Sequence, residues 1–215
     1  MKPLILAFLL LCATLVMAAS NPATPTMPPT IDRQGGPDGY GYRYVDNQNE
    51  ATGPRFEWVE IAAPAGGPGI NTNLIRDDET IAVPLQGFSM NYYGTVYADS
   101  LTICSNGFVG FGLYSTFFEN SQLPYTTHTQ PCIYPLWDDL SLPNGGSVWY
   151  YYDQANERFI VEWYQVPQAT VPMSRNTFQV RLYPTGVIEF LYHTIGSFAN
   201  SSTVGIQGPN GGSSN

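Results

Sequence analysis

The side chains of this chain that could do chemistry are few, and the acidic ones are the most suggestive. Asp138 and Asp139 end the apolar run CIYPLW, and a second acidic cluster stands at Asp77-Asp78-Glu79. Paired carboxylates can hold calcium or act as acid and base in glycoside cleavage. Adjacent strand residues point to opposite faces, so one aspartate is expected instead to cap backbone amides of the following turn, residues 140–146. The second cluster is typical of a solvated loop, although the two clusters could meet in space.

The sequence contains no recognisable complete set of catalytic residues. His128 and His193 are the only histidines, and neither adjoins a nucleophile elbow or a comparable turn. After the N-terminal apolar run, which contains Cys12, the only cysteines are Cys104 and Cys132, without a further cysteine or a nearby histidine that would indicate zinc. In an oxidising compartment this pair is most simply a disulfide, worth about 3 to 4 kcal/mol on the chain-entropy model. Two separate buried thiols are the alternative.

Aromatic side chains are the other resource, at 14% of the chain. The run Trp149-Tyr-Tyr-Tyr152 reads as a strand with aromatic groups on both faces. At least one face, with Trp149, Tyr151 and the neighbouring Tyr164, is therefore a candidate for stacking on a sugar ring or a partner protein. The alternative is that one face is core and that a loop or strand covers the other.

The elements that position these residues are strands. Apolar and polar residues alternate throughout residues 157–166 and 177–183, with Phe159, Val161 and Trp163 on one face. Turn signals at residues 153–156 and at Tyr183-Pro-Thr-Gly186 join four consecutive strands into a meander, and each strand is expected to have one buried face. Asn106-Gly107 predicts a further hairpin.

Further strands are expected at residues 42–45, 56–61 and 81–84, and residues 115–130 read as a long surface loop. No stretch shows a convincing helical period. The sequence therefore predicts an all-β fold, an antiparallel β-sandwich of about ten strands with long loops. Its boundaries are expected at residues 40–207, preceded by a Pro/Thr/Gly-rich spacer (20–39) and followed by a flexible tail or truncation point (208–215).

The N-terminus predicts secretion. Lys2 precedes an apolar run and small residues around Ala18, which is typical of a signal peptide over residues 1–19, and no membrane span is expected after its cleavage. Cleavage removes the only lysine and leaves seven arginines against 17 carboxylates, a net charge of 7 − 17 = −10. Such a surface repels phosphate backbones, so no nucleic-acid partner is expected, whereas calcium is compatible with it.

Several motifs in this order carry a family resemblance. They are FSMNYYG (88–94), LTICSNGFVGFG (101–112), IYPLWDDL (133–140), RFIVEW (158–163), NTFQVRLYPTGVIEF (176–190) and TVGIQ (203–207). The chain resembles a β-sandwich module of large secreted bacterial proteins, where it accompanies peptidase domains, adhesion modules or sorting domains. It is also similar, more distantly, to the extracellular domain of nidogen. The resemblance implies a fold and an accessory role, and it supplies no ligand or catalytic residues.

These observations favour a secreted, non-catalytic module that mediates extracellular protein or carbohydrate contacts, alone or in a larger surface protein. The rival hypothesis is a secreted hydrolase, glycosidase or peptidase-like, that uses Asp138 or Asp139 with a distant acid or His193. A third is a calcium-stabilised spacer; no other cofactor is implied.

Overall fold

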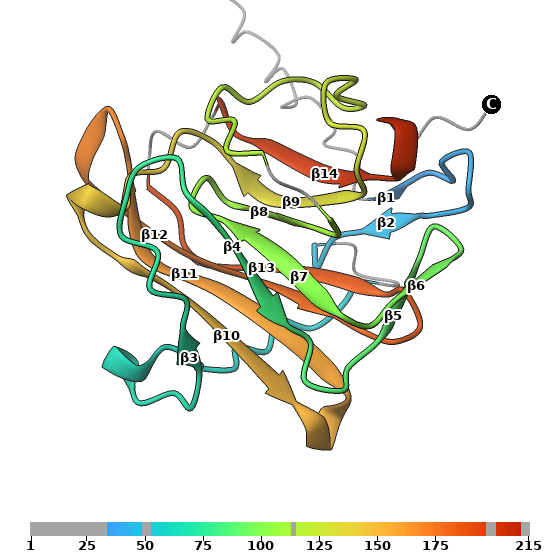
Figure 1. Ribbon diagram of the computed structural model, residues 1–215, viewed down its shortest axis with the longest axis horizontal. Coiled ribbons are helices and arrows are strands. Elements are labelled where there is room, and N and C mark those ends of the chain that lie inside the picture. The colour runs from blue at the N-terminus through green and yellow to red at the C-terminus, as the bar shows by residue number, and fades with distance from the viewer. Residues whose placement is uncertain (1–33, 49–52, 113–114, 197–200, 212–215) are drawn as a thin grey trace, which may run out of the picture. The chain divides into compact units, whose positions relative to one another are not determined.

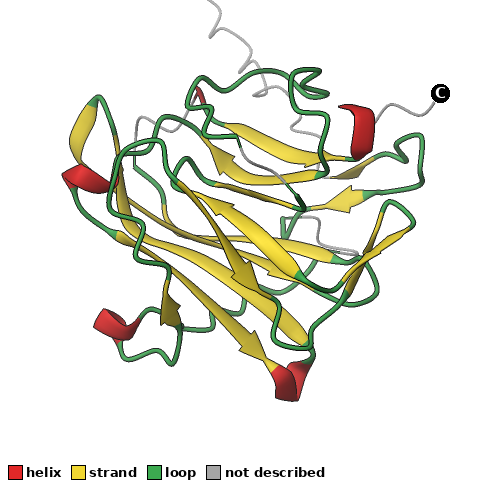
Figure 2. Ribbon diagram, in the orientation of Figure 1, coloured by secondary structure: helices red, strands yellow, loops and turns green. Residues whose placement is uncertain are grey.

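The computed structural model describes residues 34–48, 53–112, 115–196 and 201–211. The predicted signal peptide (1–19), the first part of the predicted spacer and the last residues of the predicted tail lie outside this range. Within it the chain forms fourteen strands and short 3-10 turns (Figure 2). The described part of the chain begins with β1 (Gln34–Gly35), which pairs with β2 (Tyr44–Val45). No helix of the described residues is long and apolar enough to cross a membrane.

The first sheet contains the predicted meander, and we call it the meander sheet (Figure 1). Its order is β13 (Ile188–Thr194), β12 (Val171–Leu182), β11 (Arg158–Gln168), β10 (Ser147–Asp153) and β3 (Ile70–Asn71), with all pairs antiparallel. The Tyr183–Gly186 turn closes β12 onto β13 through a hydrogen bond from Gly186 N to Tyr183 O, with φ of +90° at the glycine. The predicted four-strand meander is thus confirmed.

The second sheet contains the predicted Asn106-Gly107 hairpin, and we call it the hairpin sheet. Its order is β14 (Thr203–Gln207), β9 (Cys132–Trp137), β8 (Phe108–Gly110), β7 (Ser100–Cys104) and β4 (Thr80–Pro84). Gly107 has φ of +79°, and an added Cβ would lie 1.9 Å from Leu136 O. Only glycine fits this turn, because it adopts a positive φ and lets the two backbones approach.

The two sheets pack face to face around one hydrophobic core. Phe159, Val161 and Trp163 of β11 point into it, as the alternation predicted, and so do the apolar residues of β12. From the hairpin sheet Leu101, Ile103 and other aliphatic side chains meet them. The arrangement confirms an all-β antiparallel sandwich. Two small hairpins flank it, β1–β2 and the pair β5 (Met90–Tyr92) with β6 (Thr95–Tyr97).

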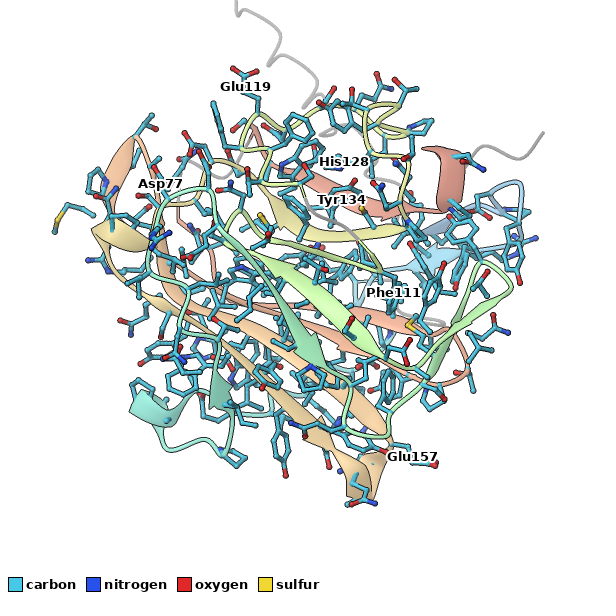
Figure 3. The ribbon with its side chains drawn as sticks, in the orientation of Figure 1. Asp77, Phe111, Glu119, His128, Tyr134 and Glu157 are labelled. Carbon is cyan, nitrogen blue, oxygen red and sulfur yellow. The ribbon has the colours of Figure 1, made fainter. Side chains whose placement is uncertain are left out.

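Each sheet also buries much of its outer face, which the alternating pattern did not predict. The irregular segment 115–131 covers the outer face of the hairpin sheet, above a cluster of Phe108, Tyr134 and Trp137. In Figure 3 the labelled side chains of His128, from that segment, and Tyr134, from β9, lie next to each other. We call residues 115–131 the aromatic cover.

The predicted strand at residues 56–61 is wrong. These residues belong to no strand, and the segment runs instead across the outer face of the meander sheet, where side chains of the sheet bind its backbone groups. A strand would need a ladder with a neighbouring backbone, and both neighbours of each central meander strand are already occupied. We call residues 57–65, which end in the 3-10 turn Ala63–Ala65, the strap.

The predicted Cys104–Cys132 disulfide is also corrected, because both cysteines are free and buried. Cys104 lies on β7 and Cys132 on β9, and β8 runs between them. Neighbouring strands lie about 4.8 Å apart, so β7 and β9 are about 9 to 10 Å apart. A disulfide needs Cα atoms within about 7 Å. The two thiols therefore belong to the separate-thiol alternative.

Candidate functional site

The strap is held on the meander sheet by a row of buried polar side chains. Arg181 Nη2 donates to Glu57 O, and Gln179 Nε2 donates to Val59 O at 2.6 Å. Ile61 N donates to Glu162 Oε2 at 3.4 Å. Strap residues 57, 59 and 61 are thus bound by β11 or β12, because residues 162, 179 and 181 all point to the outer face of the sheet.

One side chain of this row is a buried carboxylic acid whose negative charge has no neutralising partner. Glu162 is fully buried and accepts a 2.8 Å hydrogen bond from Gln179 Nε2, while its Oε1 has no hydrogen-bond partner in the described part of the chain. Burial, chiefly, raises the pKa of the Glu162 carboxyl to about 7, and the nearby negative charge of Glu60 adds to the rise. Burial lowers the pKa of the Arg181 guanidinium at the other end of the row.

Beyond the strap's edge the outer face opens into a cleft of about 320 Å³. Its walls come from the strap on one side and from β11, β12 and β13 on the other. The lining residues are Trp58, Glu60, Ala65, Tyr164, Gln165, Arg175, Thr177, His193 and Thr194. The strap and three strands of one sheet therefore build this cleft together.

The cleft combines ring faces with polar groups. The rings of Trp58 and His193 lie 5.2 Å apart between centroids, at 54° to each other. Glu60 is held in place, because its carboxylate accepts hydrogen bonds from Trp58 Nε1 at 3.3 Å and from Ala62 N at 3.0 Å. The Tyr164 hydroxyl accepts a hydrogen bond from Gln165 Nε2 at 3.1 Å. Aromatic walls with a few fixed polar groups are the usual composition of a small-ligand site.

Of the three aromatic residues that the sequence singled out, Tyr164 lines the cleft and the other two do not. Trp149 is only 8% exposed, since Ile61 and Ala62 of the strap pack on it. Tyr151 is half-buried against the same cluster. Trp149 is thus covered, as the alternative interpretation of this face held. The sequence pattern did not indicate Trp58 or Glu60 as site residues, because it predicts a strand over their segment.

Asp138 lies away from the cleft and has a structural environment. Its side chain accepts hydrogen bonds from Ser202 Oγ at 2.7 Å, from Gln168 Nε2 at 3.2 Å and from Asp139 N at 2.9 Å. The expected capping of the following turn falls to another residue, because Asn106 Oδ1 accepts the hydrogen bond from Leu140 N at 3.1 Å. Asp138 thus ties the end of β9 to β11 and to the segment before β14.

Asp139 points elsewhere and meets the second acidic cluster. One carboxylate oxygen each of Asp77, Asp78 and Asp139 lie within 4.8 Å of one another. Burial and the negative charges of Asp77 and Asp78 raise the pKa of Asp139. Carboxylate oxygens are ligands that calcium prefers. Asp139 could therefore help to hold a cation, whereas Asp138 is turned to other partners. Neither aspartate lines the cleft that contains His193.

The aromatic cover contains a serine and histidine pair that the sequence did not reveal. Ser115 Oγ lies 2.8 Å from His128 Nε2, and His128 Nδ1 lies 2.8 Å from the Tyr134 hydroxyl. His128 is 1% exposed, and its burial lowers the pKa of the imidazole to about 4, so the ring is neutral at physiological pH. The rings of Phe117 and Tyr125 contact it. These bonds fix the cover onto the sheet.

Comparison with known proteins defines the class of the molecule. Residues 51–215 match the family model described as NIDO related. The chain therefore belongs to this nidogen-related family, and the family indicates an extracellular binding module. No curated protein and no solved structure matches the chain. The matched range includes both sheets, the strap and the cleft.

Proposed function

We propose that this protein is a non-catalytic extracellular module that binds a carbohydrate in the cleft between the strap and the meander sheet. The observation that carries the proposal is the convergence of Trp58, Tyr164 and His193 with a fixed carboxylate in one solvent-open cleft. Sugar rings present apolar C–H faces and hydroxyl edges, which aromatic faces and fixed polar groups complement.

Size and charge support a small ligand over a protein partner. A cleft of about 320 Å³ is at the lower end of the range of about 300 to 1,000 Å³ for small-molecule sites. A stable protein interface needs about 800 Å² from each partner, which a cleft of this kind does not supply by itself. Glu60 and Arg175 carry opposite charges, so the cleft does not select strongly for an anion or a cation.

The test is a glycan array followed by calorimetric titration of the strongest hit. Trp58→Ala and Tyr164→Ala are each expected to weaken binding about tenfold, because each removes a stacking face. Tyr44→Ala is the matched control, since Tyr44 is an exposed tyrosine on β2 outside the cleft, and binding should be unchanged. Failure to bind any glycan, or equal loss in all three variants, would refute the carbohydrate function.

A further inference from the structure

We propose that Glu162 is a pH-responsive latch that holds the strap on the meander sheet and thereby controls the cleft. Its consequence for ligand binding rests on the function proposed above, whereas the latch itself does not. The proposal follows from how the strap is attached, from the surroundings of Glu162 and from the position of the cleft residues on the strap.

The strap has three anchors, and only one of them is a side-chain carboxyl. Arg181 and Gln179 donate hydrogen bonds to strap carbonyls, whereas Glu162 accepts the hydrogen bond from Ile61 N. The Glu162 carboxyl also has an oxygen without a partner in the described residues. A buried carboxylate in this state is costly when ionised and much less so when protonated. Detaching the strap would expose Glu162 to water and remove that cost.

The charged groups around Glu162 do not neutralise it. Glu60 on the strap adds a like charge, and Gln179 stands between Glu162 and Arg181 of β12. The Arg181 guanidinium is directed to Glu57 O and to Glu189 of β13, at 3.6 Å from its carboxylate. The other ionisable side chains on this face are Tyr151 and Asp153 of β10, Arg158 and Tyr164 of β11, Arg175 of β12, Tyr183 just after β12 and, where β13 meets Trp58, His193. Arg158 is paired with Asp153 at 2.8 Å.

The direction of the pH effect follows from the raised pKa of Glu162. The carboxyl titrates at about 7 under the strap and, once exposed, near its ordinary value of 4.5. The attached state therefore binds the proton more tightly. Its stabilisation is fully present below pH 4.5 and is lost as the pH rises through about 7. Acidic conditions close the latch and neutral conditions loosen it.

Loosening the strap would alter the cleft directly. Trp58 and Glu60 stand between the three anchored strap positions, at 57, 59 and 61, and both form cleft wall. Release of Ile61 would therefore move the Glu60 carboxylate, whose position depends on Ala62 N. Ligand affinity is expected to follow strap attachment and to be higher at pH 5 than at pH 8.

Hydrogen exchange of the full chain tests the latch without any ligand. Exchange of the Ile61 and Ala62 amides, the hydrogen-bonded ones of residues 57–62, should report an opening constant about tenfold or more larger at pH 7.5 than at pH 5 once corrected for intrinsic rates. In Glu162→Gln, which keeps the shape and removes the charge, this pH dependence should vanish. His193→Gln is the control for the neighbouring imidazole, and it should leave the dependence intact.

Glu60→Gln provides a second variant with a directional result. Removing the like charge should lower the pKa of Glu162 and move the midpoint of the exchange profile to lower pH. A pH dependence that persists in Glu162→Gln, or is absent from the unmodified protein, would overturn the latch and leave the cleft proposal untouched. Equal glycan affinity at pH 5 and pH 8, despite a changed strap, would overturn the control of binding. Absence of glycan binding at every pH would refute the carbohydrate function only.

Discussion

The two outer faces of the sandwich are both covered by irregular chain, and the covers differ in chemistry. The aromatic cover, residues 115–131, packs rings on rings, and Trp137 beneath it is fully buried with its ring 5.2 Å from that of Tyr125. The strap, residues 57–65, instead lies on a polar row of Glu162, Gln179 and Arg181. The strap also borders the cleft of about 320 Å³.

The two covers differ because aromatic packing depends on the total area in contact, whereas hydrogen bonding depends on a few atoms. Aromatic packing stabilises in proportion to the area removed from water, so the cover is held wherever rings touch. Hydrogen bonds to buried groups depend on a few atoms, and a missing partner there costs more than a formed bond contributes net. Loss of one polar group can therefore shift the strap, whereas loosening the cover requires removal of a large buried ring. This contrast associates the cover with stability and the strap with the binding function proposed above.

The largest effect is expected from a substitution beneath the aromatic cover. Trp137→Ala should lower the free energy of unfolding by about 3 to 5 kcal/mol, because it empties a buried site and leaves Phe117 O without its donor. Urea denaturation followed by circular dichroism measures it. Trp58→Ala in the strap is the matched change and should cost less than about 1 kcal/mol. Similar losses for the two tryptophans would contradict the contrast.

A smaller effect is expected from removing a polar anchor of the strap. Arg181→Met should destabilise by about 1 to 3 kcal/mol, since Glu57 O and Gln179 Oε1 lose their charged donor. The strap should loosen locally as well, so trypsin should cleave after the neighbouring exposed Arg55 faster than in the unmodified protein. Arg76→Met, an exposed arginine away from the strap, is the control. Unchanged cleavage at Arg55 would show that Arg181 does not anchor the strap.

Much of the sandwich could be predicted from the sequence, because period-two alternation and turn residues are local signals. Phe159, Val161 and Trp163 point into the core as expected, and the Asn106-Gly107 and Tyr183–Gly186 turns lie where the residues indicated. The resemblance to nidogen agrees with the matched family. These features need only neighbours in the sequence.

The site could not be predicted in the same way, since it depends on which segment lies over which face. Residues 56–61 have the composition of a strand, and only the occupied neighbours of the meander strands show why they form a strap instead. The sequence indicates Trp149 as a candidate for stacking on a ligand, but the strap covers its ring. The alternation also hid that Glu162, Gln179 and Arg181 are buried, because polar residues on alternate positions normally face water.

Labelling of the two cysteines provides a further comparison of the cover and the strap, with little expected effect on stability. Both cysteines lie inside the aromatic cluster beneath the cover. Burial raises the pKa of both thiols to about 12, and the thiolate is the reactive form. Iodoacetamide at pH 8 should therefore leave Cys104 and Cys132 unmodified in the native protein and label both once urea unfolds it, without reductant, as read by peptide mass spectrometry. Trp137→Ala should speed native labelling, since it opens the cover, whereas Arg181→Met should not. A labelled mass unchanged in urea would reveal a disulfide and require a β7, β8 and β9 arrangement different from the one described.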